Sequence, residues 1–259
     1  MKFSRLNIAA SLALFACGST LAQIAVPAGP VSPLSFNLSL TSNYKFRGQD
    51  QHLTSGSAFK PAVQGGFDYA HPSGFYVGNW NSTVSFFDTV GKKVNLEIDL
   101  YGGYKFTSGD LGFDLGALTY IYPSAGKVNT TELYAAASYG PITAKYSRTI
   151  SRGYFGVGEA TNDGRGTGYL NLAFATEVAP SVTFKASVGQ TMFRKAINSP
   201  TNFDFTDYSI GAAYDLGDGL TLAGALQGAT NKDNWQFIHN NKSRSANRDT
   251  LIFTLTKAL

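Results

Sequence analysis

The chain has 259 residues, of which 43% are hydrophobic and only 15% are charged, whereas globular domains average about 25% charged residues. Aromatic residues make up 14%, which excludes a disordered chain, because disordered chains are poor in aromatic residues. A mean hydropathy of -0.08 argues against a bundle of membrane helices, since each such helix needs about 20 consecutive, mostly apolar residues. The formal net charge of +4 is too small to indicate a nucleic-acid-binding protein.

The N-terminus has the pattern of a secretory signal peptide. Lys2 and Arg5 precede an apolar stretch that ends in Thr20-Leu21-Ala22, the small-x-small spacing that a signal peptidase recognises. We therefore expect residues 1–22 to be cleaved, which also removes the only cysteine and excludes disulfides and thiol chemistry from the mature chain. The competing interpretation is a lipoprotein box that ends at Cys17.

From Phe36 onward, apolar and polar residues alternate with a period of two, which is typical of β-strands with two unlike faces. In the first such segment, Phe36 and Leu38 share one face, and Lys45 and Arg47 share the other. Most of the segments are longer than the usual globular strand of about five or six residues and match strands that cross a bilayer. The twelve expected strands are 35–47, 59–70, 75–87, 94–106, 111–122, 131–139, 141–150, 167–178, 181–193, 205–215, 220–229 and 248–257.

Short and long connections alternate between these segments. The short ones, such as 71–74 and 216–219, contain the Gly, Pro and Asp residues that tight turns require. The long ones, such as 151–166 and 230–247, are rich in Gly, Asn, Ser and basic residues. This asymmetry is typical of a transmembrane antiparallel up-and-down β-barrel, with tight periplasmic turns at one end and longer extracellular loops at the other.

We therefore expect an all-β barrel of about twelve strands in the Gram-negative outer membrane, formed by residues 35–259 and preceded by a short periplasmic segment, residues 23–34. In such a barrel the outer face contacts lipid and lipopolysaccharide, and every strand edge is paired, because lipid offers no hydrogen bonds. Aromatic residues then gather at the two membrane interfaces. The candidates at the loop rim are Phe46, Phe86, Tyr154, Phe155 and Phe193, and Tyr76 is one of those at the short-turn rim.

Several motifs in the first four expected strands point to one family. The segment SNYKFRG at residues 42–48 is followed by a QGG strand at 64–66, an SGFY turn at 73–76 and the strand EIDLY at 97–101. This series resembles the TorF porin family, also called Gcw_chp, specifically over residues 36–106 and more loosely beyond. The resemblance implies an outer-membrane barrel whose transported substrate is largely undefined.

The polar faces of the expected strands carry charges that would line a lumen and set its selectivity. Lys45 and Arg47 share its outer half with Glu97 and Asp99, and such opposed charges would create a field across the pore that favours small polar solutes. Acidic candidates outnumber basic ones, which predicts a weak cation preference. The alternative is a barrel in which these side chains pair and plug the lumen. The expected pore-lining residues are Lys45, Arg47, Glu97, Asp99, Tyr101, Glu132, Lys145, Lys185 and Asp207.

The histidines do not form a catalytic pattern. His52, His71 and His239 all fall in connections, and no nucleophile motif accompanies them. No cluster has the spacing of metal ligands, and no Gly-rich phosphate loop precedes a helix. We therefore expect no enzymatic activity, no metal and no cofactor.

The function that this pattern favours is a porin, through which small hydrophilic solutes diffuse passively. The alternative is a surface-exposed barrel that acts as an adhesin or receptor through its long loops, without transport. Two of these loops are rich in basic residues, which attract anionic partners. The basic residues in or beside them are Arg152, Arg165, Lys232, Lys242, Arg244 and Arg248.

Overall fold

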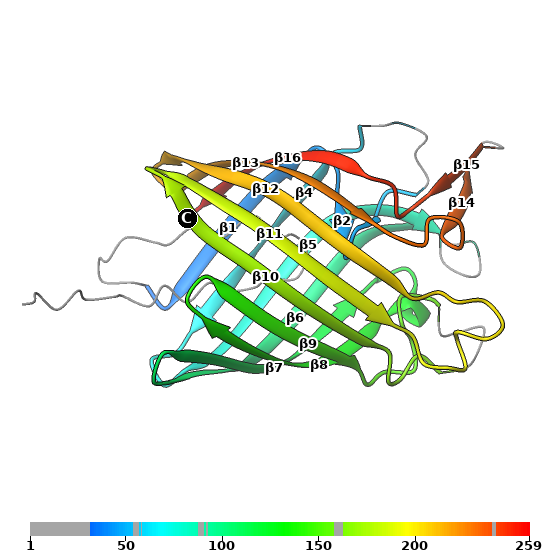
Figure 1. Cartoon of the computed structure of the whole chain (residues 1–259), viewed down its shortest axis with the longest axis horizontal. Helices are drawn as coiled ribbons and strands as arrows, with labels where there is room; N and C mark the ends of the chain where they lie inside the picture. Colours follow the sequence, from blue (N-terminus) through cyan, green and yellow to red (C-terminus); the bar gives the residue numbers. More distant parts are fainter. Residues whose placement is uncertain are drawn as a thin grey trace, which may run out of the picture.

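Twelve strands form one closed antiparallel barrel in the computed structural model (Figure 1). Each wall strand pairs with the wall strand before it in the sequence, and the last pairs with the first, so that Leu40 lies opposite Leu255. The predicted fold class is therefore confirmed. The wall strands are β1 (Leu34–Thr41), β4 (Ala62–Ala70), β5 (Phe75–Phe87), β6 (Lys93–Ser108), β7 (Leu111–Ile121), β8 (Thr130–Tyr139), β9 (Ile142–Thr149), β10 (Gly168–Ala179), β11 (Val182–Met192), β12 (Phe205–Gly217), β13 (Leu220–Ala229) and β16 (Thr250–Ala258).

The structure describes residues 32–53, 57, 59–87, 91, 93–157, 163–239 and 242–259. The expected signal peptide, residues 1–22, lies outside these ranges. Among the described residues, no helix is long and apolar enough to cross a membrane.

The two ends of the barrel differ as the connection lengths predict. The short turns and the C-terminus lie at one end, on the left of Figure 1, and the long connections lie at the other. Two of the short turns need glycine, because Gly109 and Gly140 have φ angles of 59° and 54°, which other residues rarely adopt. The long connections carry a small hairpin of β14 (Gln236–His239) and β15 (Lys242–Ser245) and a 3₁₀ turn at Gly126–Val128.

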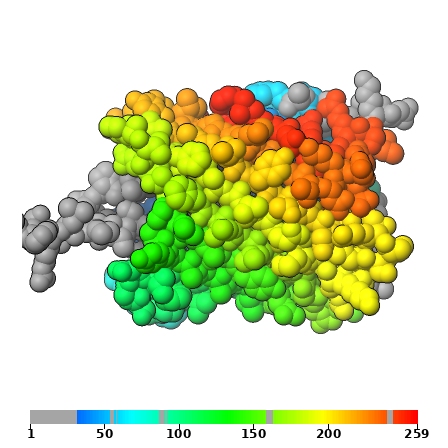
Figure 2. Space-filling view, in the orientation of Figure 1, coloured from blue at the N-terminus to red at the C-terminus, as the bar shows by residue number. Residues whose placement is uncertain are grey.

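The outside of the wall is apolar. Leucines that alternate with lumen-facing residues are half exposed, among them Leu38 and Leu133, although water-facing sheet surfaces are normally polar. The wall strands run obliquely to the long axis of the barrel (Figure 1), and the space-filling view shows the wall as a continuous packed surface (Figure 2). Near the short turns, Phe106 stacks on Phe113 with 5.0 Å between ring centroids, as expected where a barrel wall meets a membrane interface.

The expected first strand, 35–47, is too long. The wall strand β1 ends at Thr41, and the chain then turns inward to form β2 (Lys45–Phe46) and β3 (Gln49–Asp50). The turn between them places Arg47 and Gly48 at φ angles of 48° and 72°. The alternation continues through this segment because its backbone is extended as well, although it lies inside the barrel rather than in the wall.

The aromatic residues expected at the loop rim were also misplaced. Tyr154 and Phe193 do not face lipid but pack edge to face, 5.2 Å apart, in a buried cluster at the loop end of the barrel. Phe46, Phe86 and Phe155 pack against a second such cluster. The loops therefore have their own apolar core, which fixes their shape above the lumen.

Candidate functional site

A hairpin formed by residues 43–52 crosses the outer half of the lumen, the half nearer the long loops. Its Phe46 ring packs against Tyr120 of β7 at 5.4 Å. On the far side, a Cβ atom at Gly48 would lie only 2.4 Å from the carbonyl oxygen of Gly228 in β13. The segment therefore spans the barrel from wall to wall, and we call it the lumen hairpin. Glycine is required at its turn by both the backbone angle and the close approach.

A buried ion pair holds the tip of the lumen hairpin. Arg47 donates from Nη1 to Glu132 Oε1 at 3.0 Å and from Nη2 to Glu132 Oε2 at 2.7 Å, and Nη1 also donates to the Tyr154 hydroxyl at 3.1 Å. The guanidinium lies 4.0 Å from the centroid of the Tyr169 ring. The two charged side chains are only 6% and 2% exposed. This two-pronged geometry is the strong form of a charged hydrogen bond.

The base of the lumen hairpin is held by further charges. Lys45 Nζ donates to the carbonyl oxygens of Gly48 and Ala246, at 3.0 and 3.1 Å. Asp50 Oδ2 accepts from Lys60 Nζ at 2.9 Å and from Arg248 Nη2 at 3.0 Å. Asp50 is thus paired with two cations, and the Lys45 ammonium is satisfied by two carbonyl oxygens, which offsets part of the cost of burying these charges.

The wall around the lumen hairpin carries the expected acidic residues. Glu97 and Asp99 of β6 are both completely buried, and Glu97 accepts a hydrogen bond from Tyr122 at 3.0 Å. Neither carboxyl oxygen of Asp99 has a hydrogen-bond partner among the described residues. Asp207 of β12 accepts from Tyr169 at 3.1 Å. These side chains belong to a packed layer that narrows the outer half of the lumen.

The inner half, nearer the short turns, contains a tyrosine and carboxylate cluster. Tyr76 donates to Asp114 Oδ1 at 2.6 Å, and its hydroxyl also contacts that of Tyr134. The ammonium of Lys145 lies 4.0 Å from the Tyr134 ring centroid, and that of Lys105 lies 4.7 Å from the Tyr76 ring centroid. Tyr76 therefore faces the lumen and does not belong to the short-turn rim, where its aromatic character placed it. Tyr76 lies two residues before Gly78 and four before Trp80, and residues at this spacing share one face of a strand. This alternation would have predicted its lumen position.

Tyr101 links the two halves along the wall. Its hydroxyl donates to Asp68 Oδ1 at 2.6 Å, and its ring lies across Gly78. A Cβ atom at Gly78 would come within 2.4 Å of the ring, so any larger residue there would displace it.

The opposite wall has small side chains and one charge. Ala213, Ala223 and Ala225 of β12 and β13 form a buried cluster. Beside it on β11, Lys185 pairs across the sheet with Gly211 and is 8% exposed. No carboxylate lies within ion-pairing distance of its ammonium in the described parts of the chain. The strand order places β11 across the barrel from β5, so the inner half has a lysine facing a wall of tyrosines and carboxylates.

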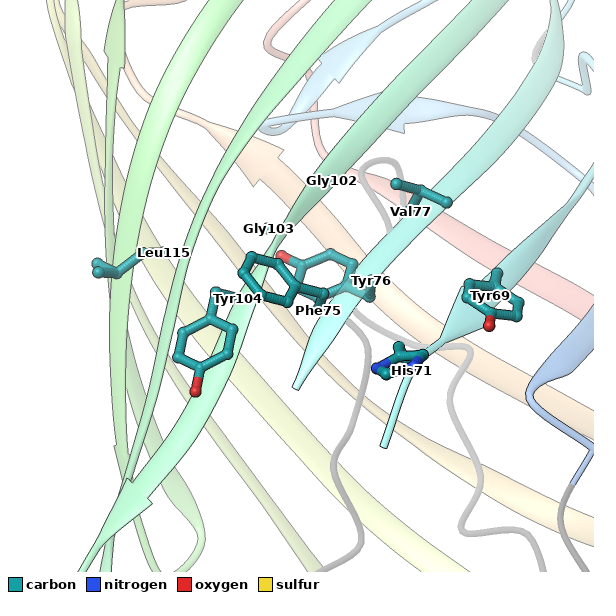
Figure 3. Close-up of a pocket in the computed structure, with 9 residues that line it drawn as sticks. All are labelled: Tyr69, His71, Phe75, Tyr76, Val77, Gly102, Gly103, Tyr104 and Leu115. Atoms are coloured by element: carbon teal, nitrogen blue, oxygen red, sulfur yellow. The ribbon is translucent and has the colours of Figure 1, made fainter. Parts of the chain in front are cut away.

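A depression of about 550 Å³ lies on the outside of the wall (Figure 3). It opens over Gly102, which has no side chain, and is flanked by the exposed residues Tyr69, Phe75 and Tyr104. Because these side chains point away from the lumen, we assign the depression to the lipid-facing surface and not to the functional site.

Several basic loop residues expected to attract an anionic partner are paired with carboxylates. Of the expected residues, Arg165 contacts Asp163 at 2.9 Å, Lys232 contacts Asp249 at 2.8 Å and Arg248 contacts Asp50 at 3.0 Å. Arg194, which was not among them, also contacts Asp163, at 2.7 Å. Such pairing lowers the net positive charge that these loops present to an anionic surface.

The Asp163 contacts predict a pH dependence for the loop between β9 and β10. Hydrogen bonds from Arg165 hold the pKa of Asp163 below its usual value of 3.8. Because the carboxylate form of Asp163 is favoured, the contact stabilises the loop above about pH 4. This stabilisation is lost as the pH falls through the lowered pKa. We expect Asp163→Asn to increase amide hydrogen exchange around Arg165 at pH 7, and the difference from the unsubstituted protein to shrink under strongly acidic conditions. An equal difference at both pH values would contradict this assignment.

The sequence matches one family model over residues 25–259, described as bacterial proteins of unknown function (Gcw_chp). The chain belongs to this family. The TorF porin name is not part of that description. No curated protein matches the sequence.

Two solved porins share the barrel fold. The NanC porin aligns with a TM-score of 0.52 at 10% identity, covering 87% of this chain and 98% of that one. The KdgM porin, solved in complex with disordered oligogalacturonate, aligns with a TM-score of 0.51 at 5% identity, covering 86% of this chain and 97% of that one. At these identities the likeness is one of fold, and it supports an outer-membrane barrel.

Proposed function

We propose that this Gcw_chp protein is an outer-membrane channel through which small hydrophilic solutes diffuse passively, after export by a signal peptide cleaved behind Ala22. The observation that carries the proposal is a closed barrel with an apolar outside and a charged, polar inside. A polar interior in a lipid-embedded barrel serves a lumen that holds water. In a barrel of eight strands the side chains just fill the interior, and a barrel of twelve strands is wider.

The lumen hairpin sets the aperture of this channel. Residues around it, such as Thr130 and Thr191, are completely buried, whereas Lys145 and Asp114 in the inner half are partly exposed. Solutes that enter from the short-turn end therefore meet the narrowest part beside Arg47 and Glu132. Only small solutes are expected to pass.

The proposal is tested by conductance measurements. The purified protein, folded into a planar bilayer, is expected to give discrete channel events of small amplitude. Absence of events, both for this protein and for a variant whose lumen hairpin has been replaced by a flexible segment, would overturn the proposal and leave a closed barrel.

We further propose that Lys185 is the main determinant of ion selectivity, because it is a lumen ammonium with no carboxylate within ion-pairing distance among the described residues. Charged groups in a pore attract oppositely charged ions. Lys185→Glu is therefore expected to shift the reversal potential in a salt gradient toward cation selectivity, and Lys185→Arg is expected to leave it unchanged. The weak cation preference of the unsubstituted channel, predicted from the charge count, is measured in the same experiment.

Lys195→Glu is the matched control for Lys185, because Lys195 is exposed in the connection between β11 and β12. It changes the net charge by the same amount without changing the lumen. Equal shifts for the two variants would contradict a specific role for Lys185.

A further inference from the structure

A cavity of about 330 Å³ lies at the loop end of the barrel, above the lumen hairpin. Phe46 and Arg47 of the hairpin form one side of it, and Phe155, Trp235 and Phe237 from the long loops form others. Eight of its described lining residues are aromatic. The proposed passage of solutes assigns no role to this cavity.

We propose that this cavity binds a small, uncharged ring compound. The volume lies at the lower end of the range for ligand sites, about 300–1,000 Å³, which suits one ring or two fused rings. The inference is independent of transport, because binding from the loop side needs no open lumen.

The aromatic lining favours a ring as the ligand. Phe155 makes an edge-to-face contact with Tyr154 at 4.9 Å, and Trp235 makes one with Phe205 at 5.5 Å. The side chains are thus held in fixed orientations by their neighbours, so their ring faces and edges are already ordered for a further ring. Each such contact stabilises a bound ring beyond the burial of its area.

The charges at the cavity favour an uncharged ligand. The two charged lining residues, Arg47 and Asp50, are already paired, the first with Glu132 and the second with Lys60 and Arg248. A charged ligand would lose its hydration without gaining a free counter-charge. A neutral ligand does not incur this cost.

Arg47 adds no free charge to the cavity. Its two terminal nitrogens donate to Glu132, and its guanidinium lies 4.8 Å from the centroid of the Phe46 ring and 4.0 Å from that of the Tyr169 ring. The inference therefore specifies an uncharged ring.

Tryptophan fluorescence tests the proposal directly, because Trp235 lines the cavity and the only other tryptophan is Trp80. The probe is 4-nitrobenzyl alcohol, a neutral ring whose nitro group quenches tryptophan, added to the full-length folded barrel in detergent. We expect saturable quenching that persists in Trp80→Phe and disappears in Trp235→Phe. Quenching that rises linearly without saturation would indicate collisions only and would overturn the proposal.

Two comparisons make the test specific. Phe237→Ala removes one lining ring from the partly exposed β14 and is expected to weaken binding about two- to tenfold. Its neighbour Ile238 is 80% exposed and does not line the cavity, so Ile238→Ala is expected to leave the affinity unchanged. The charged analogue 4-nitrobenzoate is expected to bind more weakly than the alcohol. Equal affinities for the two variants, or for the two probes, would overturn the inference, whatever the conductance of the barrel.

Discussion

Replacement of Glu132 by glutamine is expected to destabilise the barrel by about 3–5 kcal/mol, because it leaves the buried Arg47 guanidinium without its counter-charge. Both side chains are almost completely buried, so water cannot replace the lost carboxylate. The free energy of unfolding is measured by urea titration of the protein in lipid vesicles, with tryptophan fluorescence as the readout.

The matched control is Asp99→Asn, a substitution of the same kind on a neighbouring part of the lumen wall. Asp99 is as deeply buried as Glu132, but no cation contacts its carboxyl group among the described residues. Removal of an unpaired buried carboxyl is not expected to lower stability. A loss in Asp99→Asn equal to that in Glu132→Gln would show that burial, and not the pairing with Arg47, determines the effect.

The second large effect is expected in conductance. If residues 44–51 are replaced by eight Gly and Ser residues, the aromatic packing and the Arg47–Glu132 pair are lost while the length of the connection is kept. The flexible segment no longer spans the outer half of the lumen in a fixed position. Single-channel conductance is therefore expected to rise several-fold.

A Gly and Ser replacement of residues 199–202, which are exposed in another long connection, controls for loop flexibility. This second variant is expected to conduct like the unsubstituted channel. If both replacements raise the conductance equally, or neither does, the lumen hairpin does not set the aperture.

Most of the wall could be predicted from the sequence. The expected segments 75–87 and 220–229 coincide with β5 and β13, and most of the other strand boundaries agree within about two residues. The reason is that each strand has one face in lipid and one in the lumen, so the alternation is a local property that every wall strand repeats. The order of the strands around the barrel could also be predicted, because short connections place consecutive strands side by side.

The candidate site was less predictable. Lys45 and Arg47 were expected inside the barrel and do lie there, but on the lumen hairpin rather than on a wall strand. Alternation cannot distinguish an extended segment in the wall from one that crosses the lumen. Tyr154 and Phe193 were misplaced for a related reason, because an aromatic residue at a strand end suits either a membrane interface or a buried loop core.

The sequence by itself therefore determined the barrel, its strand order and the face on which most wall residues lie, since these depend on periodicity and turn residues close together in the chain. Only the tertiary structure decided which charges meet. Arg47 and Glu132 are 85 positions apart, and Asp50 and Arg248 are 198 apart. Closure of the sheet and the inward turn after Thr41 bring them together, and no local pattern encodes contacts at such separations.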